Sequence, residues 1–280
     1  MNKLFKKVLS LTVVTVMALS LTACGSKETS TADKEAASTD KKVSSAMDKD
    51  TIILGFDDTF APMGFKDEKG EVIGFDIDLA KEVASKLEKD IEFKTINWDM
   101  KETELNAGNI DFIWNGYSIS DERKEKVAFG TPYLKNKQII VTLADSDINT
   151  KADLKDKAVA AQKGSTAVDA VENEPEVLET FKDSKLVTYD TNDQVLRELE
   201  AGRCDAAVAD EILVKYYMIK KGEEKFKVLD EDFGEEEYGV GMRKDDTKLV
   251  EAFNKAYAEL KEEGKVAEIS TTWFGEDITK

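Results

Sequence analysis

An alternation of strand-like and helix-like patterns is the feature of this chain that most constrains its fold. Three strand-like segments enclose two helical ones in the first part of the chain, at residues 51–56, 77–87, 91–96, around Leu105, and 110–114. Apolar residues of the first helical segment recur at helical spacing, whereas the strand segments are continuous or alternating in hydrophobicity. A β-α-β-α-β order predicts a parallel sheet covered by helices, and therefore an α/β fold.

A second alternation follows in the remainder of the chain. Strands are expected at 138–144, 158–161, 186–189, 205–209 and 237–243, and helices at 165–171, 193–201, 211–221 and 249–263. The last helix carries its apolar side chains on one face and ends at Gly264. Two α/β blocks with a returning strand predict two lobes joined by two crossings, near residues 137–143 and 237–242.

The first residues have the pattern of a secretory signal. Three lysines precede an apolar, uncharged run over residues 8–23, and small residues lead directly to Cys24. This resembles a bacterial lipobox, which implies cleavage of residues 1–23 and lipidation of the Cys24 thiol. A plain signal peptide with an incidental cysteine is the alternative, and a transmembrane helix is disfavoured because the apolar run is short. Residues 24–49 have too little apolar content to fold and are expected to form a flexible tether.

Charge and composition exclude several classes of function. The formal net charge is −18, and loss of Lys3, Lys6 and Lys7 with the signal would bring it to −21. Nucleic acid and anionic membrane surfaces are therefore excluded as ligands. The chain has no histidine, which removes histidine-based catalysis and histidine metal ligation. Cys204 is the second of two cysteines and is expected to be a small buried residue.

Residues 116–123 combine a glycine turn, two hydroxyls and one guanidinium. Arg offers a planar two-pronged donor that matches the two oxygens of a carboxylate. Arg123 could instead belong to a solvated helix face, because charged residues surround it. The glycine and the hydroxyls before it favour a ligand site.

Several of these segments together resemble a known family. The chain is similar, over roughly residues 50–275, to the extracellular solute-binding proteins of polar amino-acid ABC transporters, solute-binding protein family 3, which have a type II periplasmic-binding-protein fold. The segments that carry the resemblance are Phe60-Ala61-Pro62, residues 74–80, residues 116–123, Phe129 with Pro132-Tyr133, Gly164-Ser165-Thr166, and residues 202–205 leading to Asp210.

The resemblance implies two lobes that close on one amino acid. The first lobe would comprise residues 50–138 plus 242–280, and the second residues 139–241. By the family pattern, Arg123 would clamp the α-carboxylate, with Ser118 and the backbone N–H of Thr166 as further donors. Asp210 would pair with the α-ammonium, together with the carbonyl of Gly116.

The same resemblance assigns residues to the side-chain end of the ligand. Phe60 and Trp98 would flank the ligand side chain, Asp57 would lie at its end, and Ser165 is a further candidate contact. Asp57 could instead be only a turn residue, and Asp210 only a helix cap. Trp114 and Tyr133 are assigned to packing, Asp76 to a helix cap, and the acidic residues 231–237 to solvated surface.

The function that this implies is capture of a free amino acid outside the cell and its delivery to the membrane permease of an ABC importer. The solute is expected to be polar and uncharged, such as glutamine or cystine, with a cationic amino acid next. A monomer without cofactor or metal, tethered to the membrane through Cys24, is predicted. The alternatives are an enzyme resembling cyclohexadienyl dehydratase, in which Asp57 or Asp210 would be the acid or base, and a ligand-sensing module.

Overall fold

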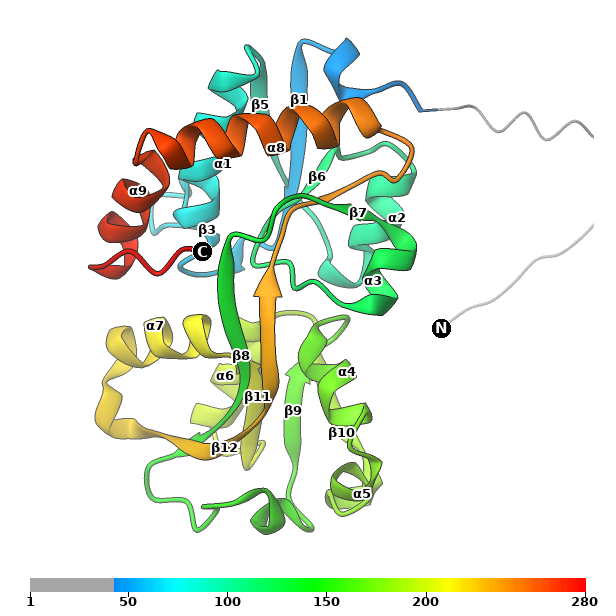
Figure 1. Ribbon diagram of the computed structural model, residues 1–280. Helices are drawn as coiled ribbons and strands as arrows, with labels where there is room; N and C mark the ends of the chain where they lie inside the picture. Colours follow the sequence, from blue (N-terminus) through cyan, green and yellow to red (C-terminus); the bar gives the residue numbers. More distant parts are fainter. Residues whose placement is uncertain (1–42) are drawn as a thin grey trace, which may run out of the picture. The chain divides into compact units, whose positions relative to one another are not determined.

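The computed structural model describes residues 43–280, which form a two-lobed α/β structure (Figure 1). Each lobe is built on a five-stranded sheet. The predicted α/β class and the two lobes are confirmed. The signal peptide, Cys24 and most of the predicted tether lie outside the described residues.

The first lobe is built around β1, in which Ile52, Leu54 and Phe56 are fully buried. β1 pairs in parallel with β5 on one side and β6 on the other, and β13 and β7 complete the sheet in the order β5-β1-β6-β13-β7. The elements of this lobe are β1 (Thr51–Phe56), β2 (Thr59–Phe60), β3 (Gly64–Lys66), β4 (Val72–Ile73), α1 (Phe75–Lys86), β5 (Asp90–Thr95), η2 (Trp98–Met100), α2 (Lys101–Asn106), β6 (Phe112–Ile113), α3 (Asp121–Lys126), β7 (Ala128–Phe129), β13 (Gly241–Met242), α8 (Thr247–Glu262) and α9 (Lys265–Phe274).

The second lobe is built on the order β10-β9-β11-β8-β12, in which β9 pairs in parallel with β10 and β11. Its central strands are short, apolar and buried on both faces, as expected for a parallel sheet between helices. The elements of this lobe are β8 (Leu134–Leu143), η3 (Lys151–Leu154), β9 (Val159–Gln162), α4 (Thr166–Glu172), α5 (Pro175–Leu178), η4 (Lys182–Ser184), β10 (Leu186–Tyr189), α6 (Asn192–Glu200), β11 (Ala206–Asp210), α7 (Glu211–Lys221), η5 (Glu223–Lys225) and β12 (Phe226–Tyr238).

Two long antiparallel strands, β8 and β12, carry the chain between the lobes and lie side by side in Figure 1. Their last pairs, Tyr238 with Leu134 and Glu237 with Lys135, lie at the entrance to the first lobe. The single strand predicted at 237–243 is wrong, because β12 begins at Phe226 and a separate β13 follows. The acidic residues of β12 interrupt any apolar pattern, so the sequence does not indicate a strand there. Pairing with β8 stabilises the strand instead.

Two further parts of the first lobe have no counterpart in the sequence prediction. β2, β3 and β4 form a small antiparallel sheet of two- and three-residue strands, too short to show a period. α9 follows α8 after the left-handed residue Gly264 and packs on α1 and α8. Gly264 therefore ends one helix and begins another.

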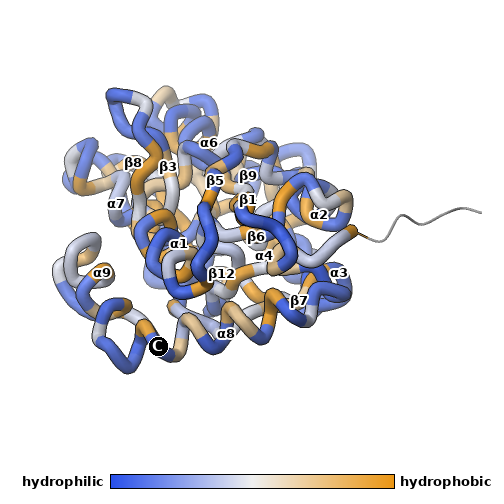
Figure 2. The backbone as a smooth tube through the Cα atoms, turned by 90° about the horizontal axis from the view of Figure 1, so that it is seen from above, coloured by the Kyte–Doolittle hydropathy of each residue, from blue (hydrophilic) through white to orange (hydrophobic). Residues whose placement is uncertain are grey.

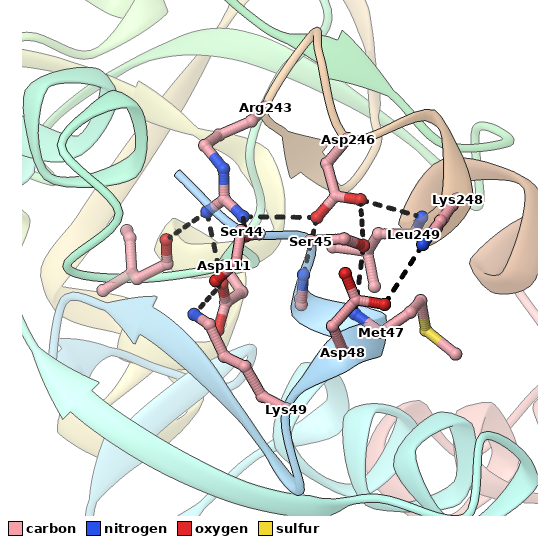
Figure 3. A network of polar contacts seen from close by, with 12 residues as sticks. Ser44, Ser45, Met47, Asp48, Lys49, Asp111, Arg243, Asp246, Lys248 and Leu249 are labelled. Atoms are coloured by element: carbon pink, nitrogen blue, oxygen red, sulfur yellow. Dashed lines mark hydrogen bonds and ion pairs between the residues drawn. The ribbon is translucent and has the colours of Figure 1, made fainter. Parts of the chain in front are cut away.

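Residues 43–49, placed in the tether by the sequence prediction, pack against the first lobe (Figure 3). The Asp246 carboxylate accepts hydrogen bonds from Ser45 Oγ at 2.5 Å and from the backbone N–H of Ala46 at 2.8 Å. The same carboxylate pairs with buried Arg243 at 3.2 Å, and Arg243 also pairs with buried Asp111. This network joins the start of the described chain to the beginning of α8.

The apolar face of α8 closes the core of the first lobe on one side. Hydrophilic and hydrophobic residues alternate along this helix in Figure 2, as an amphipathic pattern requires. Its buried residues are Leu249, Phe253, Ala256, Tyr257 and Leu260. Phe253 contacts the rings of Phe112 in β6 and of Trp114 just after that strand, at centroid distances of 5.8 and 5.4 Å.

Candidate ligand-binding cleft

Side chains from both lobes converge on one small cavity between the two sheets. The enclosed space is about 10 Å³, which is room for about one water molecule. All the predicted ligand-binding residues except Asp57 line it, and Gln162 lines it in addition. The lining residues are Phe60, Trp98, Gly116, Ser118 and Arg123 from the first lobe and Gln162, Ser165, Thr166 and Asp210 from the second.

Arg123 lies on the inner face of α3 and is only 4% exposed. The helix begins at Asp121 because Ser120 caps it, and the Ser120 hydroxyl accepts a hydrogen bond from the backbone N–H of Arg123 at 3.2 Å. The guanidinium donates to the carbonyl of Ser118 at 2.9 Å and, across the lobes, to the carbonyl of Gly164 at 3.2 Å. It also lies over the ring of Tyr117, 4.6 Å from the centroid. Arg123 is thus a buried cation and does not belong to a solvated face.

Asp210 is the last residue of β11, at the carboxyl edge of the second sheet. Its Oδ1 accepts hydrogen bonds from Asn136 Nδ2 at 2.6 Å, Gln138 Nε2 at 3.1 Å and the Tyr238 hydroxyl at 2.7 Å. The side chain makes no capping hydrogen bond to α7, so it is not simply a helix cap. Burial, followed by the nearby charge of Glu236, raises the pKa of Asp210 well above its usual range.

Ser118 and Thr166 meet across the cleft. The Thr166 hydroxyl lies 3.1 Å from the Ser118 hydroxyl, so the two lobes touch at polar groups. Thr166 is the first residue of α4, where backbone N–H groups have no partner within the helix. Ser165 precedes it and donates through its hydroxyl to the carbonyl of Gln162 at 2.7 Å.

Gly116 adopts a φ of 58°, and a Cβ at this position would lie 2.7 Å from the ring of Phe60. Glycine therefore allows both the turn and the close aromatic contact. The N–H of Gly116 donates to Asp76 Oδ2 at 2.7 Å, and the Tyr133 hydroxyl donates to the same oxygen at 3.0 Å. The predicted helix-cap role of Asp76 is wrong, since its carboxylate holds these groups instead. Burial raises the pKa of Asp76 to about 7.

Phe60 and Trp98 form an apolar wall and are 5% and 6% exposed. Trp98 packs edge-on against Tyr117, at 5.9 Å between ring centroids. Trp114 and Tyr133, assigned to packing, are fully buried in the core of the first lobe.

Asp57 follows the last residue of β1 and is 4% exposed. Its Oδ1 accepts from Thr59 N and Oγ1, at 3.0 and 2.7 Å. Its Oδ2 accepts from Gln162 Nε2 of the other lobe at 2.8 Å. Gln162 lines the cavity, so Asp57 lies directly behind it. Burial raises the pKa of Asp57, and the hydrogen bonds from Thr59 and Gln162 oppose that rise.

Sequence reasoning missed several polar residues around the cleft. Gln162 closes the end of the cleft where the ligand side chain is expected. Lys101 donates across the lobes to the carbonyl of Gly164 at 2.9 Å. Asn136 and Gln138 on β8 hold Asp210, and Glu236 on β12 reaches Ser118 at 2.8 Å. Lys101 begins α2, and the other four residues lie on strands. No motif surrounds them, and only the alternation of β8 could have indicated which side chains share a face.

Lys101 is buried, with a side-chain exposure of 4%, and pairs with Glu102 at 3.2 Å. Burial, followed by repulsion from Arg123, lowers the pKa of Lys101 to about 8. Two buried cations on one side of the cleft favour an anionic group there, whereas Asp210 and Glu236 favour a cationic group on the other. The arrangement is suited to a zwitterion that spans the two lobes.

A comparison with family models identifies the fold family. The model for bacterial extracellular solute-binding proteins, family 3, matches residues 52–276. The chain belongs to this family. The match includes both lobes and every residue of the cleft.

Proteins with established names support the same assignment. The L-cystine-binding protein TcyJ of Escherichia coli is 31% identical over 267 residues, which cover 95% of each chain. The histidine-binding periplasmic protein of Salmonella typhimurium is 34% identical over 241 residues, covering 81% of this chain and 88% of the relative. An ABC uptake transporter substrate-binding protein from Streptococcus pneumoniae, solved with bound histidine, is 40% identical. The two structures superpose with a TM-score of 0.81 over 84% of this chain and 96% of that one.

Two other classes of site were sought in the described part of the chain. No helix within residues 43–280 is long and apolar enough to cross a membrane. Within the same residues, no group of three or more His, Cys, Asp or Glu side chains is arranged to hold a metal ion.

Proposed function

We propose that this protein captures a free amino acid outside the cell and delivers it to the permease of an ABC importer. The observation that carries the proposal is that buried Arg123 and buried Asp210 come from different lobes and line one cavity. An α-carboxylate and an α-ammonium are the groups that this pair of opposite charges recognises. The names of the relatives, which are binding proteins for cystine and histidine, support the same class of solute.

Recognition of both charges requires that the lobes be closed. Arg123 reaches the second lobe at Gly164, and Ser118 reaches it at Thr166, so the ligand groups are in contact with both lobes only in this arrangement. Exclusion of water strengthens each pairing. Closure thereby reports that the site is occupied, and a permease can distinguish loaded from empty protein by shape.

Asp57 and Gln162 point to the character of the ligand side chain. A side chain that passes Phe60 and Trp98 would reach a carboxylate and an amide already joined at 2.8 Å. Such an end accepts a hydrogen-bond donor or a positive charge and repels an acid. We propose a polar uncharged amino acid such as glutamine or cystine as the solute, with a cationic one as the second choice.

A thermal-shift screen of the twenty amino acids plus cystine tests this function. A specific ligand at 100 times its dissociation constant stabilises the protein by about 2.7 kcal/mol. We expect a shift for a small set of solutes with a donor at the end of the side chain. The absence of a shift for every amino acid would overturn the proposal.

We also propose that the mature protein is attached to the membrane through a lipid on Cys24. The small residues before Cys24 and the apolar run support this attachment. A diacylglyceryl group provides two chains, which suffice for stable anchoring. Cys24→Ser should release the protein into the soluble fraction, because serine has no thiol to accept the lipid. Detergent-phase partitioning of the variant, equal to that of the unmodified protein, would contradict the attachment.

A further inference from the structure

Glu236 brings a second carboxylate to the cleft from β12, one of the two strands that cross between the lobes. Its Oε1 accepts a hydrogen bond from Ser118 Oγ at 2.8 Å, and its Oε2 accepts one from Thr166 Oγ1 at 2.7 Å. Ser118 and Thr166 belong to opposite lobes and both line the cavity. Glu236 is therefore in contact with the predicted ligand site from both sides.

Glu236 and Asp210 share their hydrogen-bond donors. Asn136 Nδ2 lies 2.6 Å from Asp210 Oδ1 and 2.6 Å from Glu236 Oε1. Gln138 Nε2 lies 3.1 Å from the first oxygen and 2.8 Å from the second. Two oxygens that share two nitrogens are close neighbours, so the carboxylates form a pair at the end of the cleft where the ammonium is expected.

Two carboxylates at such short range cannot both be ionised without a cation between them, and one proton shared by the pair relieves the repulsion. Burial and the Glu236 charge raise the pKa of Asp210, in agreement with this geometry. The hydrogen bond from Tyr238 opposes that rise.

The charged groups around the two carboxylates do not neutralise them, so the shared proton serves as their counterion. Arg123 lines the same cavity but directs its guanidinium to the carbonyls of Ser118 and Gly164. Lys101, the second buried cation of the cleft, donates to the carbonyl of Gly164 and pairs with Glu102. The groove beside Glu236 adds no cation, because the other ionisable residues that line it are all acidic. They are Asp121, Glu122, Asp169, Glu174 and Glu235.

We propose that Glu236 is a second acidic acceptor for the ligand ammonium, and that the Glu236–Asp210 pair exchanges a shared proton for that ammonium when the amino acid binds. The ligand enters as a zwitterion and keeps its own protons. The proton leaves the pair for the solvent, and the ammonium takes its place as the counterion. This inference rests on the proposed function, and it adds a coupling between amino-acid binding and pH.

Calorimetry in buffers of different ionisation enthalpy measures the coupling directly. The ligand is the tightest amino acid from the screen whose own groups do not titrate between pH 6 and 8. We expect release of up to one proton per amino acid bound. We also expect an affinity that rises with pH by up to tenfold per unit while the pair holds the proton.

Glu236→Gln keeps the shape of the side chain and removes its charge. This variant should release fewer protons than the unmodified protein, and the pH dependence of its affinity should be shallower over the same range, because Asp210 stays buried but loses the neighbouring charge. Glu235→Gln is the matched control, because the Glu235 side chain lines the open groove but is 74% exposed, and its carboxylate pairs with Lys137 at 3.5 Å. The control should release as many protons as the unmodified protein.

Three results would overturn the proposal: no proton release by the unmodified protein, unchanged release in Glu236→Gln, or loss of release in Glu235→Gln. If Glu236→Gln fails to fold, the same measurement on the unmodified protein with a ligand analogue that lacks the α-amino group replaces it. That analogue should release no proton, and release equal to that of the amino acid would overturn the proposal. Failure of all amino acids to bind would instead overturn the proposed function, so the two failures are distinct.

Discussion

At the scale of single residues, Arg123 is the group on which amino-acid binding should depend most. It is buried, and its guanidinium donates to the carbonyl oxygens of Ser118 and Gly164 and lies over the ring of Tyr117. Among the described residues it forms no ion pair, so a ligand carboxylate would be its first full counter-charge. Removing one partner of a buried charge pair costs about 3–5 kcal/mol.

We therefore expect Arg123→Ala to weaken binding by about a hundredfold or more while the protein still folds. Lys124→Ala is the matched control, because its side chain is exposed and pairs with Asp121 on the outer face. Titration calorimetry measures both variants. A loss of less than fivefold in Arg123→Ala would remove Arg123 from the ligand site.

A second prediction at this scale concerns Asp57 and the selectivity of the site among amino acids. If its carboxylate receives the end of the ligand side chain, glutamate meets a like charge in a site without water and is rejected. Asp57→Asn should allow glutamate to bind, with little change for glutamine. Asp58→Asn is the control, since Asp58 pairs with Lys66 at 2.7 Å outside the cleft. Tight binding of glutamate by the unmodified protein would show that Asp57 does not face the ligand.

At the scale of elements, the start of α8 depends on a buried ionic network. The Asp246 carboxylate caps the helix at Leu249 N, holds Ser45 and Ala46, and pairs with Arg243 (Figure 3). Loss of a helix cap costs about 1 kcal/mol, and an unpaired buried charge costs more. Arg243 would keep Asp111, which limits the penalty.

We expect Asp246→Ala to lower the free energy of unfolding by about 2–4 kcal/mol and to leave amino-acid affinity unchanged. Urea titration measures the first quantity and calorimetry the second. Asp245→Ala is the control, because the neighbouring side chain is exposed. Equal stability of the two variants would mean that the network contributes nothing beyond surface charge.

The elements also show what the sequence can and cannot predict. β10 and α7 were placed at their observed bounds because their apolar runs lie between clear turn signals. β12 was missed since its pairing with β8 over many residues, and not its own composition, makes it a strand. Glu236 was assigned to solvated surface for the same reason, because the crossing of β12 into the cleft is not visible in a local pattern. Residues of the cleft were found where a family motif surrounds them, as at Arg123.

At the scale of the whole molecule, contacts between the lobes determine how the empty protein divides between open and closed forms. Gln162 provides one of them, donating to Asp57 at 2.8 Å and accepting from Asn192 Nδ2 at 2.8 Å. Lys163 and Asp99 form another at 2.9 Å, but their side chains are 56% and 35% exposed, and exposed pairs contribute at most about 1 kcal/mol. The buried contact should therefore have more influence on closure.

Gln162→Ala leaves a buried carboxylate oxygen without its donor only when the lobes are closed, which costs about 1–3 kcal/mol in that form alone. The empty variant should therefore be more open, with a larger radius of gyration in small-angle scattering, and should bind its amino acid about tenfold more weakly. Saturating amino acid should restore the compact form, because the ligand bridges the lobes at other residues. Gln194→Ala is the control, since Gln194 is exposed on α6 and its amide oxygen accepts from Asp190 N of the same lobe. An unchanged radius together with unchanged affinity would show that the Asp57–Gln162 contact forms too late, or too weakly, to bias the closure on which delivery to a permease depends.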